Sequence, residues 1–245
     1  MNKLPAIAVT MGIFLFAGCA TIQRKLLFYP SHHAQTNGLA AWEESGKIIG
    51  FSRQVPAPKN IWLMIHGNGG QATDRAYAIP CFSAQDSVFI LEYPGYGNRE
   101  GLPSKSAFDA AAAAAYLLLR NTFPQTPVCI VGESIGSGPA CTLANQLHPP
   151  DKIVLVVPFD TLKSVAADHL PFFPVGLILG ESWDNIYSLS TYEGPVEIFA
   201  AEQDTVIPII HAERLSAHVP SVKFHRISGN HNDWSKPTKV SIENS

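Results

Sequence analysis

Ser134 occupies the middle of a Gly-x-Ser-x-Gly pentapeptide, residues 132–136, which directly follows the apolar run at residues 128–131. The apolar run predicts a short β-strand and the residues after the pentapeptide predict a helix, so the serine is expected on a sharp strand-to-helix turn. Such a turn strains the backbone, holds the hydroxyl clear of the chain and places a helix N-terminus beneath it. A purely structural turn is the competing interpretation, but the predicted strand and helix favour a nucleophile.

A serine hydroxyl is a weak nucleophile at neutral pH and needs a base that removes its proton during attack. His231 is the candidate base, because it is the only histidine after the last predicted strand and imidazole titrates in the required range. A carboxylate must orient that histidine. We select Asp204, which follows a predicted strand. Asp160 also follows one and remains a rival, whereas Asp233 lies too near His231 in the sequence to turn back on it.

A glycine-rich segment, His-Gly-Asn-Gly-Gly at residues 66–70, follows the apolar run at residues 61–65. A turn of this kind can aim backbone N–H groups at the oxyanion that forms during acyl transfer. The expected donors are the amides of Asn68 and of Ile135, the residue after the candidate nucleophile. A phosphate-binding loop is the alternative, but the segment lacks both the Gly-Lys-Ser/Thr ending and the Gly-x-Gly-x-x-Gly pattern.

The elements that must position these residues alternate between strands and helices along the chain. Several predicted strands are continuous apolar runs, which is typical of parallel strands buried on both faces. Strands are predicted at residues 47–54, 60–65, 87–93, 127–132, 152–157, 195–201 and 221–227, and helices at residues 104–122, 134–147 and 209–218. This alternation predicts a doubly wound α/β sheet, whose ligands lie beyond the carboxyl ends of the strands.

Taken together, these residues resemble the α/β-hydrolase superfamily, in particular its compact branch of lysophospholipase-, serine aminopeptidase- and thioesterase-like proteins. The resemblance covers residues 45–235 and rests on the segments 66–68, 92–97, 132–136, 158–159, 204–208 and 229–233. It implies an α/β-hydrolase fold with a mostly parallel sheet of roughly eight strands, and Ser134, Asp204 and His231 as the triad. The chain departs from the family after His231, where only the polar residues 232–245 follow instead of a longer closing helix.

Composition excludes some function classes. Only 15% of the 245 residues are charged, the formal net charge is −3, and no basic cluster is present, so nucleic-acid binding has no electrostatic basis. The proposed chemistry requires no metal or organic cofactor.

Three cysteines remain apart from Cys19, which belongs to the N-terminal segment: Cys81, Cys129 and Cys141. An odd number of cysteines argues against a disulfide framework. Cys129 and Cys141 are expected to be small buried hydrophobic residues, and Cys81 is left undecided.

The N-terminus reads as a separate targeting segment. Lys3 precedes an apolar run at residues 4–17, which is too short to span a bilayer comfortably and has the length of a signal-peptide core. The run ends in Phe-Ala-Gly-Cys and resembles a bacterial lipobox, with Phe16 where leucine is usual. It implies lipidation of Cys19, whereas an ordinary signal or an uncleaved anchor is the alternative. We therefore predict a signal peptide at 1–18, a lipidated N-terminus and linker at 19–45, and a hydrolase domain at 46–245.

The segment at about residues 158–194 lies between two predicted strands and is the natural cap of the site. Its centre, residues 170–179, is almost wholly apolar, which suits an acyl-chain pocket, a membrane contact or simple packing on the sheet. We expect a lipid-anchored serine hydrolase of the cell envelope, on the periplasmic side, that cleaves an ester or thioester, with a small-molecule or lipid acyl substrate. An aminopeptidase-like hydrolase and a non-catalytic envelope binding module are the alternatives.

Overall fold

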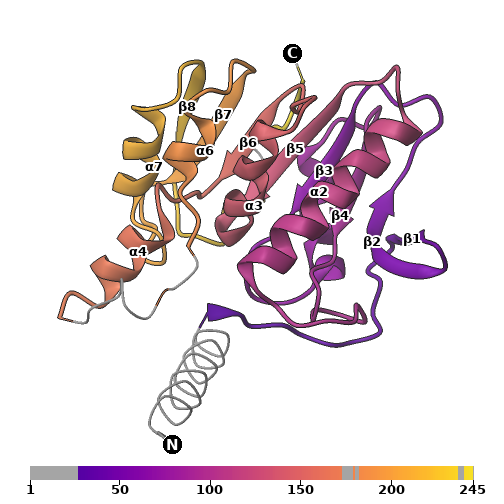
Figure 1. Cartoon of the computed structure of the whole chain (residues 1–245), viewed down its shortest axis with the longest axis horizontal. Helices are drawn as coiled ribbons and strands as arrows, with labels where there is room; N and C mark the ends of the chain where they lie inside the picture. Colours follow the sequence, from indigo (N-terminus) through magenta and orange to yellow (C-terminus); the bar gives the residue numbers. More distant parts are fainter. Residues whose placement is uncertain (1–26, 173–178, 180–181, 237–239, 245) are drawn as a thin grey trace, which may run out of the picture.

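The computed structural model of the chain describes residues 27–172, 179, 182–236 and 240–244 (Figure 1). Within these residues, eight strands form one sheet in the order β1-β2-β4-β3-β5-β6-β7-β8. The pairs β1–β2 and β2–β4 are antiparallel and the remaining pairs are parallel. The strands are β1 Ala40–Glu44, β2 Lys47–Arg53, β3 Ile61–Ile65, β4 Ser87–Leu91, β5 Val128–Glu133, β6 Ile153–Val156, β7 Val196–Ala201 and β8 Val222–Ile227.

The central strands explain why the sheet is parallel and covered on both sides. Every residue of β3, β4, β5, β6 and β7 is buried, and β3 and β6 are continuous apolar runs. The edge strand β8 is mostly half-buried or exposed, and its exposed positions are Lys223 and Arg226. The expected α/β-hydrolase architecture, a mostly parallel sheet flanked by helices, is confirmed.

The first strand lies in the region that we expected to be a linker, residues 19–45. Ser45 and Gly46 both have positive φ, as the two-residue turn of a tight hairpin requires, and they join β1 to β2. Trp42 is the one buried side chain of β1 and its ring lies 4.9 Å from that of Phe89. A strand with a single buried residue has too little apolar alternation to be recognised in the sequence.

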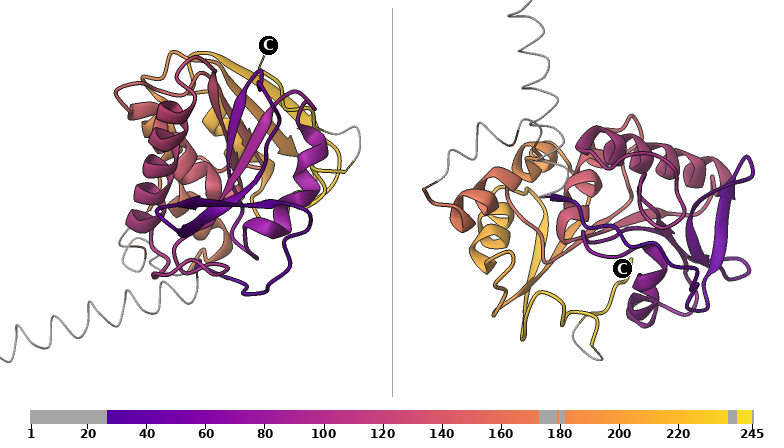
Figure 2. Two further views of the ribbon diagram at one scale, coloured as in Figure 1. Left: turned by 90° about the vertical axis from the view of Figure 1, so that its right-hand side faces the viewer. Right: turned by 90° about the horizontal axis from the view of Figure 1, so that it is seen from below.

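Helices cover the two faces of the sheet unequally. The buried apolar side chains of α2, α3, α4 and α7 belong to one core cluster, whereas those of η1 belong to the cluster on the opposite face (Figure 2). The helices are α2 Lys105–Thr122, α3 Ser137–Thr142, α4 Leu162–His169, α6 Asn185–Leu189 and α7 Ile209–Ser216, with 3₁₀ helices η1 Ala72–Cys81, η2 Ser134–Gly136 and η3 Leu143–Asn145. No helix among the described residues is long and apolar enough to cross a bilayer.

Three helix predictions have different outcomes. The helices expected at residues 104–122 and 209–218 are confirmed as α2 and α7, and the Ser104 hydroxyl caps α2 by accepting the Ala107 amide at 3.1 Å. The helix expected at residues 134–147 is divided into η2, α3 and η3. No helix follows β8 in the described part of the chain; instead Trp234 and Ile242 are buried on the η1 face, and the Ile242 amide donates to the Cys81 carbonyl.

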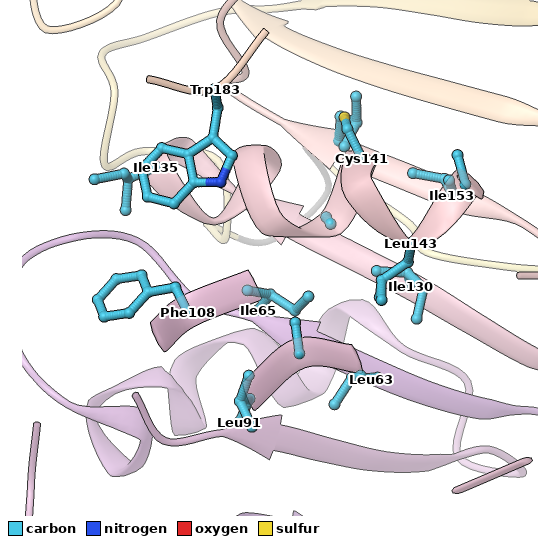
Figure 3. Packing of buried hydrophobic residues seen from close by; sticks show 14 of the residues in the cluster. Leu63, Ile65, Leu91, Phe108, Ile130, Ile135, Cys141, Leu143, Ile153 and Trp183 are labelled. Carbon is cyan, nitrogen blue, oxygen red and sulfur yellow. The ribbon is translucent and has the colours of Figure 1, made fainter. Parts of the chain in front are cut away.

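The returning part of the cap packs on the domain. Trp183 lies beside Ile135 and over Phe108 of α2 (Figure 3), with 6.3 Å between the Trp183 and Phe108 ring centroids. A Cβ at Gly138 would lie 2.5 Å from the Trp183 ring, so the glycine allows α3 to approach it. The Trp183 indole N–H also donates to Asp109 at 2.8 Å. This end of the cap therefore packs on α2 and α3. Of the predicted apolar centre, residues 170–179, residues 173–178 lie outside the described residues.

Candidate active site

Ser134 lies at the junction of β5 and η2 in a strained conformation. Its φ is +54°, in the left-handed region that a side chain other than glycine rarely adopts. The turn tolerates no Cβ at either flanking glycine: at Gly132 it would lie 2.6 Å from Ala140 Cβ, and at Gly136 it would lie 2.6 Å from the His66 carbonyl oxygen. The expected sharp strand-to-helix turn is therefore present.

The structure brings Ser134, His231 and Asp204 together from three separate loops. His231 Nε2 lies 2.9 Å from Ser134 Oγ, and His231 Nδ1 lies 2.7 Å from Asp204 Oδ2. The other Asp204 oxygen accepts the amides of Val206 and Ile207, each at 2.8 Å, which fixes the carboxylate within its own loop. With the Nδ1 proton donated to Asp204, Nε2 is free to accept the serine proton.

The two rival carboxylates lie elsewhere. Asp160, after β6, lies 2.7 Å from Nδ1 of a different histidine, His211. Asp233 accepts the Asn230 amide at 3.0 Å and forms part of the turn that carries His231. Of the three candidates, Asp204 is the one whose carboxylate contacts His231.

The loop that carries Asn68 lies against the turn that carries Ile135. The loops follow β3 and β5, which are neighbours in the sheet with Ile65 in register with Gly132. The Asn68 side chain faces away from this junction toward the first described residues: it donates to the Leu27 carbonyl, accepts the Tyr29 amide at 3.2 Å and accepts the Tyr96 hydroxyl at 3.0 Å. The side chain of Asn68 thus anchors the N-terminal segment, and the backbone N–H remains the candidate donor.

Sequence reasoning missed a buried charged cluster beside the triad. The Glu133 carboxylate, next to Ser134, accepts hydrogen bonds from Gly67, Arg75, Tyr77 and Trp234. Burial by itself raises the pKa of Glu133, but the Arg75 charge and these hydrogen bonds outweigh it and hold the pKa below its ordinary value. A glutamate at the end of a wholly apolar strand was the available signal, because buried carboxylates need partners.

The remaining sequence predictions concern cysteines, metals and lipidation. Cys81, Cys129 and Cys141 are buried free thiols, and burial raises the pKa of each, so Cys129 and Cys141 are small buried residues as expected and Cys81 joins them. Among the described residues, no group of His, Cys, Asp and Glu side chains could hold a metal ion. Cys19 and the predicted signal peptide lie outside the described residues.

Comparison with known proteins gives the chain its family. A family model described as alpha/beta hydrolase fold matches residues 62–177. An uncharacterised protein of Mycobacterium tuberculosis (strain CDC 1551 / Oshkosh) is 32% identical, over 95% of this chain and 89% of that protein. Lysophosphatidylserine lipase ABHD12 of Danio rerio is 29% identical over 72% of this chain, which spans 52% of that protein.

Solved structures show the same architecture at low sequence identity. An esterase of Pyrococcus furiosus superposes with a TM-score of 0.64 at 11% identity, over 86% of this chain and 91% of the esterase chain. A lipase-esterase related protein of Clostridium acetobutylicum superposes with a TM-score of 0.63 at 14% identity, over 77% of this chain and 94% of that one. From its sheet topology, the family model and the relative that it matches almost throughout, the chain belongs to the α/β-hydrolase family.

Proposed function

We propose that this chain is a serine hydrolase that cleaves a carboxylic ester or thioester through an acyl-enzyme, with Ser134 as nucleophile, His231 as base and Asp204 as its orienting carboxylate. The observation that carries the proposal is the continuous contact of the three side chains. Ser134 Oγ is 2.9 Å from His231 Nε2, whose ring is in turn 2.7 Å from Asp204. These distances suit direct proton transfer from the serine during attack.

The reaction follows from this arrangement. Ser134 Oγ forms a bond to the acyl carbon while its proton passes to His231 Nε2, and Asp204 stabilises the imidazolium that results. The amides of Asn68 and Ile135 donate to the oxyanion of the tetrahedral intermediate. His231 then returns the proton to the departing alkoxide or thiolate. Water attacks the acyl-enzyme by the same route, and no metal or organic cofactor takes part.

An acyl-lipid substrate is supported by exposed apolar side chains around the site. Phe172, just after α4, is 99% exposed, and Val206, two residues after Asp204, is 49% exposed. The two segments are joined by His169, whose Nε2 lies 2.8 Å from the Val206 carbonyl oxygen. Tyr29, beside the Asn68 loop, is also exposed, and Figure 1 shows α4 and the first described residues at the same lower end of the view. The name of the Danio rerio relative, a lysophosphatidylserine lipase, agrees with such a substrate.

A membrane location completes the proposal. If Cys19 carries the lipid, only seven residues, 20–26, separate it from Leu27, which contacts the Asn68 side chain. An extended segment of that length spans roughly 30 Å at most. The anchor would therefore keep the Asn68 loop within reach of the membrane surface, on the periplasmic side of the cell envelope, where acyl lipids are the neighbouring substrates.

A fluorophosphonate probe tests the serine chemistry. The native chain is expected to be labelled, and Ser134→Ala is expected to abolish labelling and to lower kcat on a short p-nitrophenyl ester by roughly 10⁵-fold or more. Ser241→Ala, at an exposed position, is the control and should react like the native chain. A folded native chain that neither reacts with the probe nor hydrolyses any ester would contradict the proposal and favour a binding module.

A second experiment separates the substrate classes. We expect hydrolysis of esters to increase with acyl length, and aminoacyl amides to react more slowly than any of them. Phe172→Asp should lower the rate on lysophospholipid in vesicles roughly tenfold, about the value of one aromatic side chain buried in lipid, and should leave a soluble ester unaffected. Leu147→Asp, 89% exposed and far from the carboxyl ends of the strands, is the matched control. Preference for aminoacyl amides would instead indicate a peptidase.

A further inference from the structure

The Glu133 carboxylate joins three segments that the reaction needs. Oε2 accepts the Gly67 amide at 2.8 Å and Arg75 Nε at 2.9 Å, and Oε1 accepts the Tyr77 hydroxyl at 2.9 Å and Trp234 Nε1 at 3.1 Å. Gly67 precedes Asn68, and Trp234 lies three residues after His231. Glu133 itself directly precedes Ser134. One buried carboxylate thus contacts the nucleophile turn, the oxyanion loop and the histidine loop.

The partners of this carboxylate are suited to an ionised acid and not to an amide. Gly67, Arg75 and Trp234 present N–H groups that can only donate. A glutamine at position 133 would offer one acceptor oxygen and turn an NH₂ group toward one pair of donors. Side-chain exposure is 6% for Glu133 and 10% for Arg75, so little water is available to compensate for a lost partner.

Arg75 acts on the peptide bond that carries the Asn68 N–H. Its Nη2 donates to the Gly67 carbonyl at 3.2 Å and to the Gly69 carbonyl at 2.5 Å, while its Nε is held by Glu133. The Gly67 carbonyl and the Asn68 N–H belong to one trans peptide unit and therefore point in opposite directions. His66 Nδ1 also lies 2.7 Å from the Gly67 carbonyl oxygen. Because Arg75 and His66 together hold this carbonyl, the Asn68 N–H must face away from both side chains.

We infer that Arg75 and Glu133 are a positioning pair that sets the direction of the Asn68 N–H toward the reacting acyl group. The inference rests on the proposed serine hydrolase activity. The planar guanidinium fork is required, because it must reach a carboxylate and two carbonyls at once. The pair acts through the loop that follows β3, next to the Ser134 turn that follows β5 (Figure 1), and Glu133 also holds Trp234 of the histidine loop.

A second buried ion pair provides the matched control. Lys152 and Glu197 are 2.7 Å apart, with side-chain exposures of 4% and 12%, and they lie between β6 and β7 away from the triad. If Arg75 and Glu133 only stabilised the fold, removal of either pair would have the same kind of effect. A positioning role predicts an effect on kcat for the first pair alone.

The test compares Glu133→Gln and Arg75→Lys with Glu197→Gln in the full chain. For each variant, kcat and KM on a short p-nitrophenyl ester, the melting temperature and the Ki of a trifluoromethyl ketone that mimics the oxyanion are measured. Loss of one oxyanion donor lowers kcat by roughly 10²- to 10³-fold. We expect losses up to this size for Glu133→Gln and Arg75→Lys, with KM within about threefold of the native value and the ketone weakened in parallel with kcat. Glu197→Gln should lower the melting temperature and leave kcat unchanged.

The outcomes separate this inference from the proposed function. If the native chain reacts with fluorophosphonate and hydrolyses the ester, but folded Glu133→Gln and Arg75→Lys keep native kcat and ketone affinity, the inference is wrong and the proposed function stands. A parallel loss of kcat in Glu197→Gln would also overturn it. If Glu133→Gln does not fold, Arg75→Lys decides, because it keeps the positive charge and removes the fork. An inactive native chain would overturn both proposals.

Discussion

Two of the histidine–aspartate pairs among the described residues, His231–Asp204 and His211–Asp160, have the same length and a different character. His231 Nδ1 and His211 Nδ1 each lie 2.7 Å from a carboxylate oxygen, of Asp204 and Asp160 respectively. Both carboxylates follow parallel strands at the same edge of the sheet. The pairs differ at the other ring nitrogen: His231 Nε2 lies 2.9 Å from Ser134 Oγ, whereas His211 Nε2 lies 3.1 Å from Asp168 of α4.

The environments of His231 and His211 therefore indicate different roles for the two pairs. The His231 side chain is 11% exposed and lies beside the Ser134 hydroxyl, whereas the His211 side chain is completely buried with a carboxylate on either side. His211 joins the loop after β6, the cap helix α4 and the first turn of α7, and Arg214 lies 3.7 Å from Asp160. A histidine with an orienting acid becomes a candidate base only where its second nitrogen meets a group to deprotonate. The His211 pair is instead a structural contact.

The largest expected difference between the pairs is in catalysis. His231→Ala should lower kcat on a short ester by roughly 10⁵- to 10⁶-fold, because it removes the group that accepts the Ser134 proton. His211→Ala should change kcat by less than about tenfold, since its ring contacts no member of the triad. Steady-state hydrolysis by both variants measures this. Equal losses in the two variants would contradict the distinction drawn from the Nε2 partners.

Substitution of the aspartate should likewise lower kcat far more in the His231–Asp204 pair than in the His211–Asp160 pair. Asp204→Asn is expected to lower kcat by about 10⁴-fold, because the amide favours the wrong histidine tautomer while the Val206 and Ile207 amides retain an acceptor. Asp160→Asn is expected to leave kcat within about tenfold of the native value and to lower stability. Ester hydrolysis and urea denaturation of both variants check this. Loss of catalysis in Asp160→Asn alone would move the acid to Asp160.

Loss of the His211 side chain should lower stability more than loss of the His231 side chain, which is the reverse of their expected effects on kcat. His211→Ala removes a completely buried ring and the histidine partner of the buried Asp160, and it should lower the free energy of unfolding by about 3 kcal/mol or more. His231→Ala should lower it by less, about 2 kcal/mol at most, because the amides of Val206 and Ile207 still donate to the Asp204 carboxylate. Urea denaturation followed by tryptophan fluorescence measures both. A His211→Ala variant as stable as the native chain would show that the buried pair contributes no stability.

The smallest expected effect is on the pH dependence of stability, and it concerns Glu133, the residue that precedes Ser134. The pKa of Glu133 is lower in the folded chain than its ordinary value of 4.5, so its stabilising contribution is present above that value and is lost as pH falls through the folded-state pKa. Between about pH 6 and about pH 3, the native chain should lose more stability than Glu133→Gln does, by less than the roughly 3 kcal/mol expected for His211. Urea midpoints across this range test it; identical pH profiles would mean that Glu133 is not ionised.

Much of the fold was predictable because buried strands and tight turns require local sequence patterns that can be recognised. Strands that are covered on both faces must be continuously apolar, and β3 and β6 were recognised on that basis. The strained turn at Ser134 was recognised because glycines must flank it where no Cβ fits. The strand β1 and the 3₁₀ helix η1 were missed, since one has a single buried side chain and the other has no regular apolar period. The helices α4 and α6 were missed as well, since each is short and buries only two or three side chains.

Contacts within the site were less predictable, because they join residues that no local pattern connects. Arg75 and Glu133 are 58 positions apart in the sequence, and Asn68 is 41 positions from Leu27. The N-terminal segment, expected to be part of a linker, contacts the Asn68 loop because the Gly70 amide donates to the Tyr29 carbonyl at 3.1 Å. Such contacts follow from which strands become neighbours, and the strand order 4-3-5-6 is a property of the whole sheet.

The amino-acid sequence by itself determined the chemistry that is available: a serine on a glycine-flanked turn, and acids and histidines at the ends of strands. It favoured Asp204 as the partner of His231 but left Asp160 as a rival, because both aspartates follow parallel strands. Tertiary structure decided between them, by placing Asp204 at His231 and Asp160 at His211. Local sequence specifies where a chain turns and what it buries, whereas a hydrogen bond depends on distances of about 3 Å that only the packed sheet sets.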